Sequence, residues 1–269
     1  LSACDGDETN HNYHENGTYN SVRETTYINN PVVDDNTAND DVVSGPAFIT
    51  AAKKQQLTAL LGTKAVTENV PGMTLAVFKE GEPMFTTTYG LENIENNRPM
   101  TDTVRMRVGS ATKTFTALTT LQLVEEGMLS LDDKLSDLLP GRLSIYNPET
   151  VTVRHMLNHT SLICDFTHGP TWGTKLTTDP TYVWTPSELL AEIEDGSLGF
   201  APAICSEDAD PAVTWMYSNT NYVALGMIIE NTTGNSWESE VRSRFIDTLN
   251  LSNTIVPNNS SDITAFHST

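Results

Sequence analysis

One short pattern in the sequence combines a nucleophile with a base. Ser110 and Lys113 form the only S-x-x-K pattern in the chain. Residues three apart on a helix share a face, so the hydroxyl and the amine can meet. A serine hydroxyl becomes a good nucleophile when a base takes its proton, and a lysine serves as that base when its charged form is disfavoured by burial and by a helix N-terminus. The same N-terminus points backbone N–H groups toward an oxyanion, so the pattern predicts acyl transfer.

The surroundings of this pattern distinguish it from a chance match, of which about one is expected in a chain of this length. An alternating, strand-like run over 103–108 leads to Gly109, and a helix is predicted from about Ser110. Apolar residues recur at helical spacing, and Gly127 is a suitable end. These apolar positions are Phe115, Leu118, Leu121 and Val124.

A second candidate pattern is Tyr217-Ser218-Asn219, which precedes an apolar helical run. A phenol near a lysine can relay a proton, and an asparagine amide can both donate to a substrate carbonyl and accept from a lysine. The Y-x-N pattern alone is weak, because Tyr27-Ile28-Asn29 also fits it within a polar segment. Only the later copy lies in a context that suits a site.

The elements that must position these residues begin with a helix over 47–62, ending at Gly62. Two strands, 73–78 and 84–89, flank turn residues at 80–83 and predict a β-hairpin. After the nucleophile segment, helices are predicted over 132–139, 152–159, 219–231 and 236–248. Thr152 is the predicted N-cap of the second of these. A further helix is predicted to open at Thr185, with Glu188 completing a capping box. This order predicts an α+β fold.

The first 45 residues are rich in Asn, Asp, Thr and Glu. Such a segment cannot bury enough surface to offset its ordering entropy, so residues 5–45 are predicted to be a disordered polar tether. Residues 1–4, Leu-Ser-Ala-Cys, resemble a bacterial lipobox, in which the Cys carries the lipid after cleavage. Cys4 is therefore a candidate lipidation site, and the folded domain is predicted to span 46–269.

The formal net charge is −20, from 35 acidic and 15 basic residues. This excess argues against nucleic acid as a partner and against binding of the folded domain to an anionic membrane surface. No stretch approaches the roughly 18 apolar residues that span a bilayer. Membrane attachment is predicted through a lipid anchor only, at the periplasm or cell surface.

The remaining cysteines and the histidines suggest structural roles. Cys164 and Cys205 could pair in an exported protein or remain as two free, partly buried thiols, and neither lies in a C-x-x-C pattern. His155 and His159 are spaced i, i+4, but no Glu follows the first, so packing or capping is predicted instead of a metal. His11 and His14 in the tether give no convincing metal site either. No cofactor is predicted.

Four segments together resemble the penicillin-recognising serine hydrolases, the group of class C β-lactamases, D,D-carboxypeptidases, D-aminopeptidases and family VIII esterases. In chain order, they are the nucleophile segment, the connection after its helix, the helix before an active-site loop and the Tyr-x-Asn motif. They are residues 108–115 (VGSATKTF), 125–133 (EEGMLSLDD), 153–161 (VRHMLNHTS) and 215–222 (WMYSNTNY). The resemblance covers roughly residues 50–255.

The resemblance implies specific roles for four residues. Ser110 would be acylated, Lys113 would accept or shuttle its proton, Tyr217 would act as a base, most clearly for the deacylating water, and Asn219 would hold substrate and Lys113. The implied fold is a β-lactamase/transpeptidase-like body, with an antiparallel sheet flanked by helices and an all-helical region. Implied substrates are D-amino-acid peptides, peptidoglycan stems or small esters. A dedicated β-lactamase and a non-catalytic penicillin-binding or sensor domain stay open.

Three departures from the family pattern stand out. Leu162 occupies a position where the family usually has Gly, and a Leu adopts positive φ at greater cost, so a different loop is predicted. A Cys- and acid-rich stretch over 204–213 replaces a short Pro-Gly turn. The late motif, Lys or His, a small residue and Gly, is absent, since 267–269 (HST) does not fit. The pattern predicts a chain truncated at both ends, with C-terminal strands missing and the motif roughly 100 residues further on.

Overall fold

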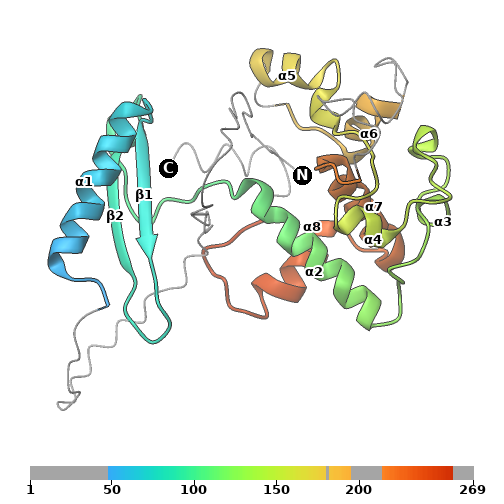
Figure 1. Cartoon of the computed structure of the whole chain (residues 1–269), viewed down its shortest axis with the longest axis horizontal. Helices are drawn as coiled ribbons and strands as arrows, with labels where there is room; N and C mark the ends of the chain where they lie inside the picture. The colour runs from blue at the N-terminus through green and yellow to red at the C-terminus, as the bar shows by residue number, and fades with distance from the viewer. Residues whose placement is uncertain (1–47, 180–181, 195–213, 257–269) are drawn as a thin grey trace. The chain divides into compact units, whose positions relative to one another are not determined.

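The structure is a computed structural model that describes residues 48–179, 182–194 and 214–256. The chain divides into two compact units, whose described parts are residues 48–106 and the described residues from Arg107 onward. The first unit carries a sheet and the second is built from helices (Figure 1). The predicted α+β fold, with an antiparallel sheet, flanking helices and an all-helical region, is confirmed.

The first unit is a helix packed on a small antiparallel sheet. It contains α1 (Ala51–Thr67), β1 (Gly72–Val77), β2 (Phe85–Asn93) and β3 (Arg98–Pro99), with the strands in the order β1-β2-β3. β1 and β2 pair as the predicted hairpin. Figure 1 shows α1 lying alongside this hairpin. The helix supplies an apolar cover that so small a sheet requires.

Glycine shapes two places in this unit. A Cβ at Gly72 would lie 2.1 Å from the carbonyl oxygen of Leu91, so only glycine permits this approach of β1 to β2. The prediction that α1 ends at Gly62 is wrong, since the helix continues for a further turn. Gly62 lies against the ring of Tyr89, where a Cβ would come within 3.1 Å. The absence of a side chain at Gly62 makes room for the Tyr89 ring, and the glycine does not end the helix.

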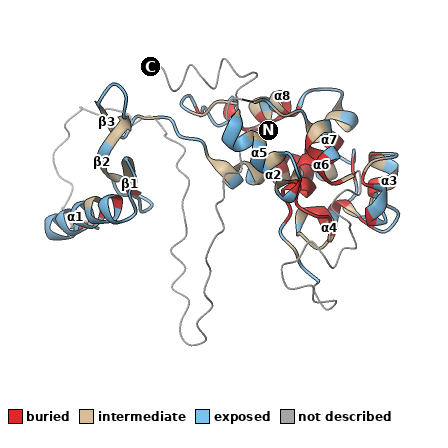
Figure 2. Ribbon diagram, turned by 90° about the horizontal axis from the view of Figure 1, so that it is seen from above, coloured by how far each residue is buried: buried red, intermediate tan, exposed pale blue. Residues whose placement is uncertain are grey.

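The second unit is organised around one buried helix. Its elements are η1 (Gly109–Ala111), α2 (Thr112–Glu125), α3 (Leu135–Leu138), η2 (Ser144–Tyr146), α4 (Val153–Leu157), η3 (Phe166–His168), α5 (Trp172–Thr178), α6 (Pro186–Glu194), α7 (Asn219–Thr233), α8 (Trp237–Val241) and a π-helical turn, η5 (Arg242–Ile246). α7 contacts α2, α4, α6 and α8, and its central apolar residues are fully buried. Buried residues cluster around α6 and α7 in Figure 2.

Several local predictions are confirmed in this unit. The hydroxyl of Thr152 accepts from the backbone N–H of His155 and caps α4, which ends at Leu157. Thr185 and Glu188 form the predicted capping box, because the Thr185 N–H donates to the Glu188 carboxylate while the Glu188 N–H donates to the Thr185 hydroxyl. Both signals depend only on residues three apart, which explains why the sequence reveals them.

Three predicted elements differ in the structure. Residues 103–108 form no strand, because no neighbouring segment in the described ranges supplies a hydrogen-bonding ladder. The helix predicted over 132–139 is confined to α3, since Lys134 has extended backbone and bridges to Thr152, so the helix begins only at Leu135. The helix predicted over 236–248 changes from α8 into the π-helical η5, a wider turn that contains both Arg244 and Phe245.

No helix in the described ranges combines the length and apolar character needed to cross a membrane.

Candidate active site

Ser110 and Lys113 meet at the start of α2, within the helical unit. Ser110 lies in the 3-10 turn η1, which runs directly into α2. The Lys113 Nζ donates a hydrogen bond to the Ser110 Oγ at 3.2 Å. Ser110 is exposed, so its hydroxyl lies on an open face of the unit. The predicted helical face therefore brings the amine within hydrogen-bonding distance of the hydroxyl.

Tyr217 reaches the same hydroxyl from a segment 107 residues further along the chain. Its Oη lies 2.8 Å from the Ser110 Oγ, and either oxygen could be the donor. Tyr217 is 39% exposed and lies two residues before the first residue of α7. The serine hydroxyl thus lies within hydrogen-bonding distance of one amine and one phenol, which come from segments far apart in the sequence.

The amine of Lys113 is enclosed by polar and aromatic groups. It donates to the Oδ1 of Asn219, the first residue of α7. It also lies 4.8 Å from the centre of the Tyr217 ring and 5.5 Å from the centre of the Tyr222 ring. A cation is attracted to the faces of such rings, so these contacts hold the amine beside the serine. The structure brings together the four residues proposed from the sequence.

Asp165 is a member of this cluster that the sequence analysis missed. It is 6% exposed, and its Oδ2 accepts from both the backbone N–H and the Nδ2 of Asn219, each at 2.9 Å. It follows the 153–161 segment by four residues, so an acidic residue shortly after His-Thr-Ser was the available signal. A loop aspartate usually lies in solvent, and its burial depends on a contact 54 residues away.

His159 packs against the ring of Tyr217. Its ring stacks on the Tyr217 ring with centroids 4.6 Å apart, and its Nδ1 accepts from the backbone N–H of Ser218 at 3.2 Å. Burial lowers the pKa of His159, and the charge of Lys113 lowers it further, while Asp165 opposes the shift. The expected packing role is thus observed for His159, and His155 caps α4. No group of three metal-binding side chains occurs in the described residues.

Four consecutive polar residues, Ser218 to Asn221, are all buried and fasten the 159–166 segment, here called the loop strap. Two hydroxyls of the run, those of Ser218 and Thr220, donate to the carbonyl oxygen of Cys164. The Oδ1 of Asn221 accepts from the Ser161 hydroxyl at 2.7 Å, and the Thr220 hydroxyl accepts from the N–H of Phe166 at 2.9 Å. The loop strap is therefore held along most of its length by the start of α7.

Leu162 adopts the left-handed backbone in which the family usually has glycine. Its φ is +56°, and that of His159, three residues earlier, is +61°. Leu162 therefore adopts the positive φ despite its Cβ, and the expectation that the loop differs from that of the family stays a prediction. Left-handed backbone costs a residue with a Cβ roughly 1–2 kcal/mol. The hydrogen bonds of Ser161 and Cys164 on either side hold the turn in place.

Cys164 is fully buried and is disulfide-bonded. Cys4, Cys205 and the stretch 204–213 lie outside the described residues, so lipidation, the Cys164–Cys205 pairing and the effect of that stretch stay predictions. His11 and His14 lie outside them as well.

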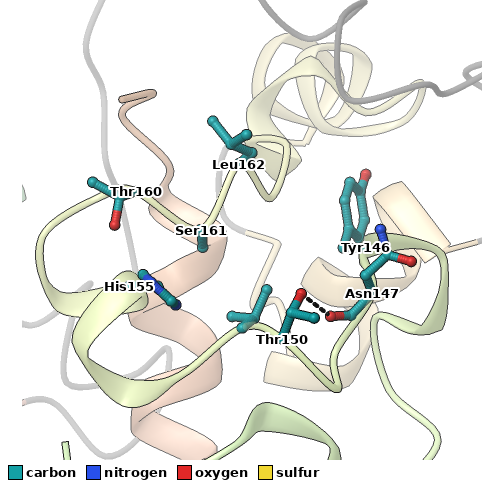
Figure 3. Close-up of a pocket in the computed structure, with 8 residues that line it drawn as sticks. Tyr146, Asn147, Thr150, His155, Thr160, Ser161 and Leu162 are labelled. Carbon is teal, nitrogen blue, oxygen red and sulfur yellow. Dashed lines mark hydrogen bonds between the residues drawn. The ribbon is translucent and has the colours of Figure 1, made fainter. Parts of the chain in front are cut away.

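A pocket of about 280 Å³ is lined by residues that come before, within and after α4 in the sequence. Figure 3 shows its lining, which comes from the segment before α4, from α4 itself and from the loop strap. The lining residues are Tyr146, Asn147, Thr150, Val151, His155, Thr160, Ser161 and Leu162. Neither Ser110 nor Tyr217 contributes to it, so the serine site and this pocket are separate features.

Comparison with known proteins places this geometry in context. The family described as Beta-lactamase matches residues 52–269. Penicillin-binding protein 4 of Amycolatopsis lactamdurans is 34% identical over 187 residues, which are 68% of this chain and 44% of that protein. Penicillin-binding protein 4* of Bacillus subtilis is 29% identical over 194 residues, covering 71% of this chain and 39% of that protein. The chain spans less than half the length of these relatives.

Solved structures give a similar result. A D-stereospecific amidohydrolase from Streptomyces is 34% identical with a TM-score of 0.57, over 72% of this chain and 54% of that one. An octameric penicillin-binding protein homologue from Pyrococcus abyssi is 30% identical with a TM-score of 0.60, over 73% and 43%. The D-amino acid amidase from Ochrobactrum anthropi SV3, complexed with D-phenylalanine, is 27% identical with a TM-score of 0.55, over 73% and 50%.

Proposed function

Since the chain belongs to the beta-lactamase family, we propose that it acts as a serine hydrolase that forms an acyl-enzyme through Ser110. The observation that carries this proposal is the position of the Ser110 Oγ, which lies within hydrogen-bonding distance of both the Tyr217 Oη and the Lys113 Nζ. A nucleophile next to a potential base, which is itself oriented by a third group, is the arrangement that covalent catalysis requires. Asn219 orients Lys113 in this way.

In the proposed reaction, the neutral amine of Lys113 or the phenolate of Tyr217 takes the Ser110 proton as the Oγ bonds to the carbonyl carbon. The C–N or C–O bond of the tetrahedral adduct then breaks, and the leaving amine or alcohol departs with that proton. Water next attacks the ester carbonyl and gives one proton to the Tyr217 phenolate, which becomes the phenol. The acid leaves, and Ser110 recovers a proton from the phenol.

The proposed substrates are D-amino-acid peptides, peptidoglycan stems or small esters. Relatives named as a D-stereospecific amidohydrolase and a D-amino acid amidase favour an amide next to a D-residue. Relatives named as penicillin-binding proteins support reaction with a β-lactam, as substrate or as trap. A dedicated β-lactamase and a non-catalytic penicillin-binding sensor are the competing functions.

The first experiment is covalent labelling of the full gene product with a fluorophosphonate and with fluorescent penicillin. Ser110→Ala should abolish labelling, whereas Ser144→Ala, which removes another exposed hydroxyl, should leave it unchanged. Tyr217→Phe keeps the ring that stacks on His159 and removes only the Oη. It should slow labelling about 10²- to 10⁴-fold, the usual contribution of a general base. Equal labelling of Ser110→Ala and the parent would reject the proposal.

Turnover assays then separate the candidate functions. Rapid hydrolysis of a chromogenic cephalosporin would favour a dedicated β-lactamase. Release of D-alanine or of a D-amino-acid amide, with slow loss of the penicillin label, would favour a peptidase or amidase. A permanent label with neither activity would favour the sensor function.

We also propose an exported, periplasmic or cell-surface location with a lipid anchor on Cys4. The support is the Leu-Ser-Ala-Cys sequence over 1–4. Cys4→Ser in the full gene product should move the protein from the membrane fraction to the aqueous fraction. Retention of the variant in the membrane fraction would contradict a lipid anchor at this residue.

A further inference from the structure

The carboxylate of Asp165 accepts four hydrogen bonds in a buried position beside the proposed site. Its Oδ2 accepts from the backbone N–H and the Nδ2 of Asn219, each at 2.9 Å. Its Oδ1 accepts from the backbone N–H and the hydroxyl of Thr167, also each at 2.9 Å. An ionised carboxylate has about four acceptor positions, so all of them are in use. Both oxygens are therefore fixed, one toward α7 and one toward η3.

These bonds determine which way the Asn219 amide faces. A carboxylate only accepts, so it selects the Nδ2 end of the amide. A lysine ammonium only donates, so it requires the Oδ1 end. Asn219 lies between Asp165 and Lys113 and satisfies both in a single orientation. The reversed amide would place an oxygen against the carboxylate and a nitrogen against the amine.

Asp165 also holds the helix that carries Asn219. Ser218 is the N-cap residue of α7 but makes no side-chain capping bond. The first free N–H of this 15-residue helix, that of Asn219, donates to Asp165 instead. A negative charge at a helix N-terminus is favourable, which stabilises the ionised carboxylate in its buried position. The backbone and the side chain of Asn219 are thus fixed by the same oxygen atom.

We propose that Asp165 is a positioning residue, which acts through Asn219 to hold the amide oxygen toward Lys113 during acylation of Ser110. The inference rests on the proposed function, because it assigns a role within the same reaction. Asp165 does not touch the reacting atoms. Its effect on the rate of Ser110 acylation should therefore require the Asn219 side chain, and this requirement is what the experiment measures.

The experiment is a double-mutant cycle on the rate of covalent labelling of the full gene product by a fluorophosphonate. Asp165→Asn replaces one acceptor oxygen by a donor, so either Thr167 or Asn219 loses its partner. Labelling should slow roughly 10- to 100-fold, the scale expected when a reacting group is misplaced by about 1 Å. In an Asn219→Ala background, the same change should alter the rate by less than about twofold.

A matched control separates positioning from a general loss of structure. Glu192 is a second buried carboxylate of the helical unit, 8% exposed, which accepts from the backbone N–H groups of Thr171 and Trp172 at the start of α5. Glu192→Gln should reduce stability while leaving the labelling rate of the folded protein unchanged. If Asp165→Asn does not fold, Thr167→Val removes one bond to the carboxylate and should slow labelling by a smaller factor that also vanishes in the Asn219→Ala background.

The possible outcomes distinguish this inference from the proposed function. Labelling that persists in Ser110→Ala would reject the proposed function. If Ser110→Ala abolishes labelling while Asp165→Asn labels at the parental rate, only the positioning role is rejected. An Asp165→Asn effect of equal size with and without the Asn219 side chain would also overturn it, because Asp165 would then act by another route.

Discussion

Acidification should weaken the folded state through His159. In the structure, the Nδ1 of His159 accepts from the backbone N–H of Ser218, a fully buried residue. Protonation turns this acceptor into a donor, so two N–H groups would face each other. Burial, together with the charge of Lys113, holds the pKa of His159 below its ordinary value of 6.5. The folded chain therefore resists a proton that the unfolded chain accepts.

The sign and size of the effect follow from this difference in proton binding. Stability from neutral His159 is fully present above pH 6.5, the ordinary value, and is lost as the pH falls from there toward the lower folded pKa. One proton changes the free energy of unfolding by at most about 1.4 kcal/mol per pH unit. Between about pH 6.5 and about pH 5.5 the integrated loss is at most about 1 kcal/mol. An unsatisfied buried donor costs about 1–3 kcal/mol, which is consistent with this size.

Urea unfolding of the helical unit at about pH 8, 6.5 and 5.5 provides the assay, with Tyr and Trp fluorescence as the signal. His159→Asn removes the titrating ring, keeps an acceptor and tolerates the positive φ at this position. Its stability should fall less than that of the parent over the acidic range. His168→Asn, which removes an exposed imidazole, should match the parent. Equal pH dependence of His159→Asn and the parent would refute the reasoning.

Three further substitutions test packing and capping in the helical unit. Thr116→Val removes the acceptor of the buried Trp237 Nε1, now 3.1 Å away, and should lower the free energy of unfolding by about 1–3 kcal/mol in urea. Arg244→Met leaves the carboxylate of Glu240, 8% exposed, without its guanidinium partner, and should cost about 2–3 kcal/mol by the same measurement. Thr152→Ala removes the N-cap of α4 and should cost about 1 kcal/mol in thermal or urea unfolding. Parental stability of any of these variants would contradict the contact assigned to it.

Local chemistry made part of the fold predictable. The hairpin, the cap at Thr152 and the capping box at Thr185 all depend on residues close in sequence. Predictions were less accurate where the outcome depended on tertiary contacts. α1 continues past Gly62, which packs against the Tyr89 ring, and the alternating run over 103–108 has no strand partner in the described residues.

The residues of the candidate site also differ in how far the sequence alone could predict them. The proximity of Ser110 and Lys113 follows from helical spacing and is found in the structure. Tyr217 entered the prediction through its Y-x-N pattern and family resemblance, because spacing alone cannot bring together residues 107 positions apart. Asp165 was missed because its importance lies wholly in contacts with α7 and η3. A single acidic residue in a loop carries no periodicity that could reveal such burial.

The run from Ser218 to Asn221 has a consequence for which kinds of change the chain can accept. The side chains of its four residues bond to three residues of the loop strap, Ser161, Cys164 and Asp165, so their order along the chain matters as much as their chemistry. A substitution removes one partner and leaves the others matched. Insertion or deletion of a single residue at the start of α7 would rotate every following side chain by about 100°, so the pairings of Asn219, Thr220 and Asn221 would fail together. Length changes should therefore accumulate elsewhere among relatives, while this short stretch keeps its spacing.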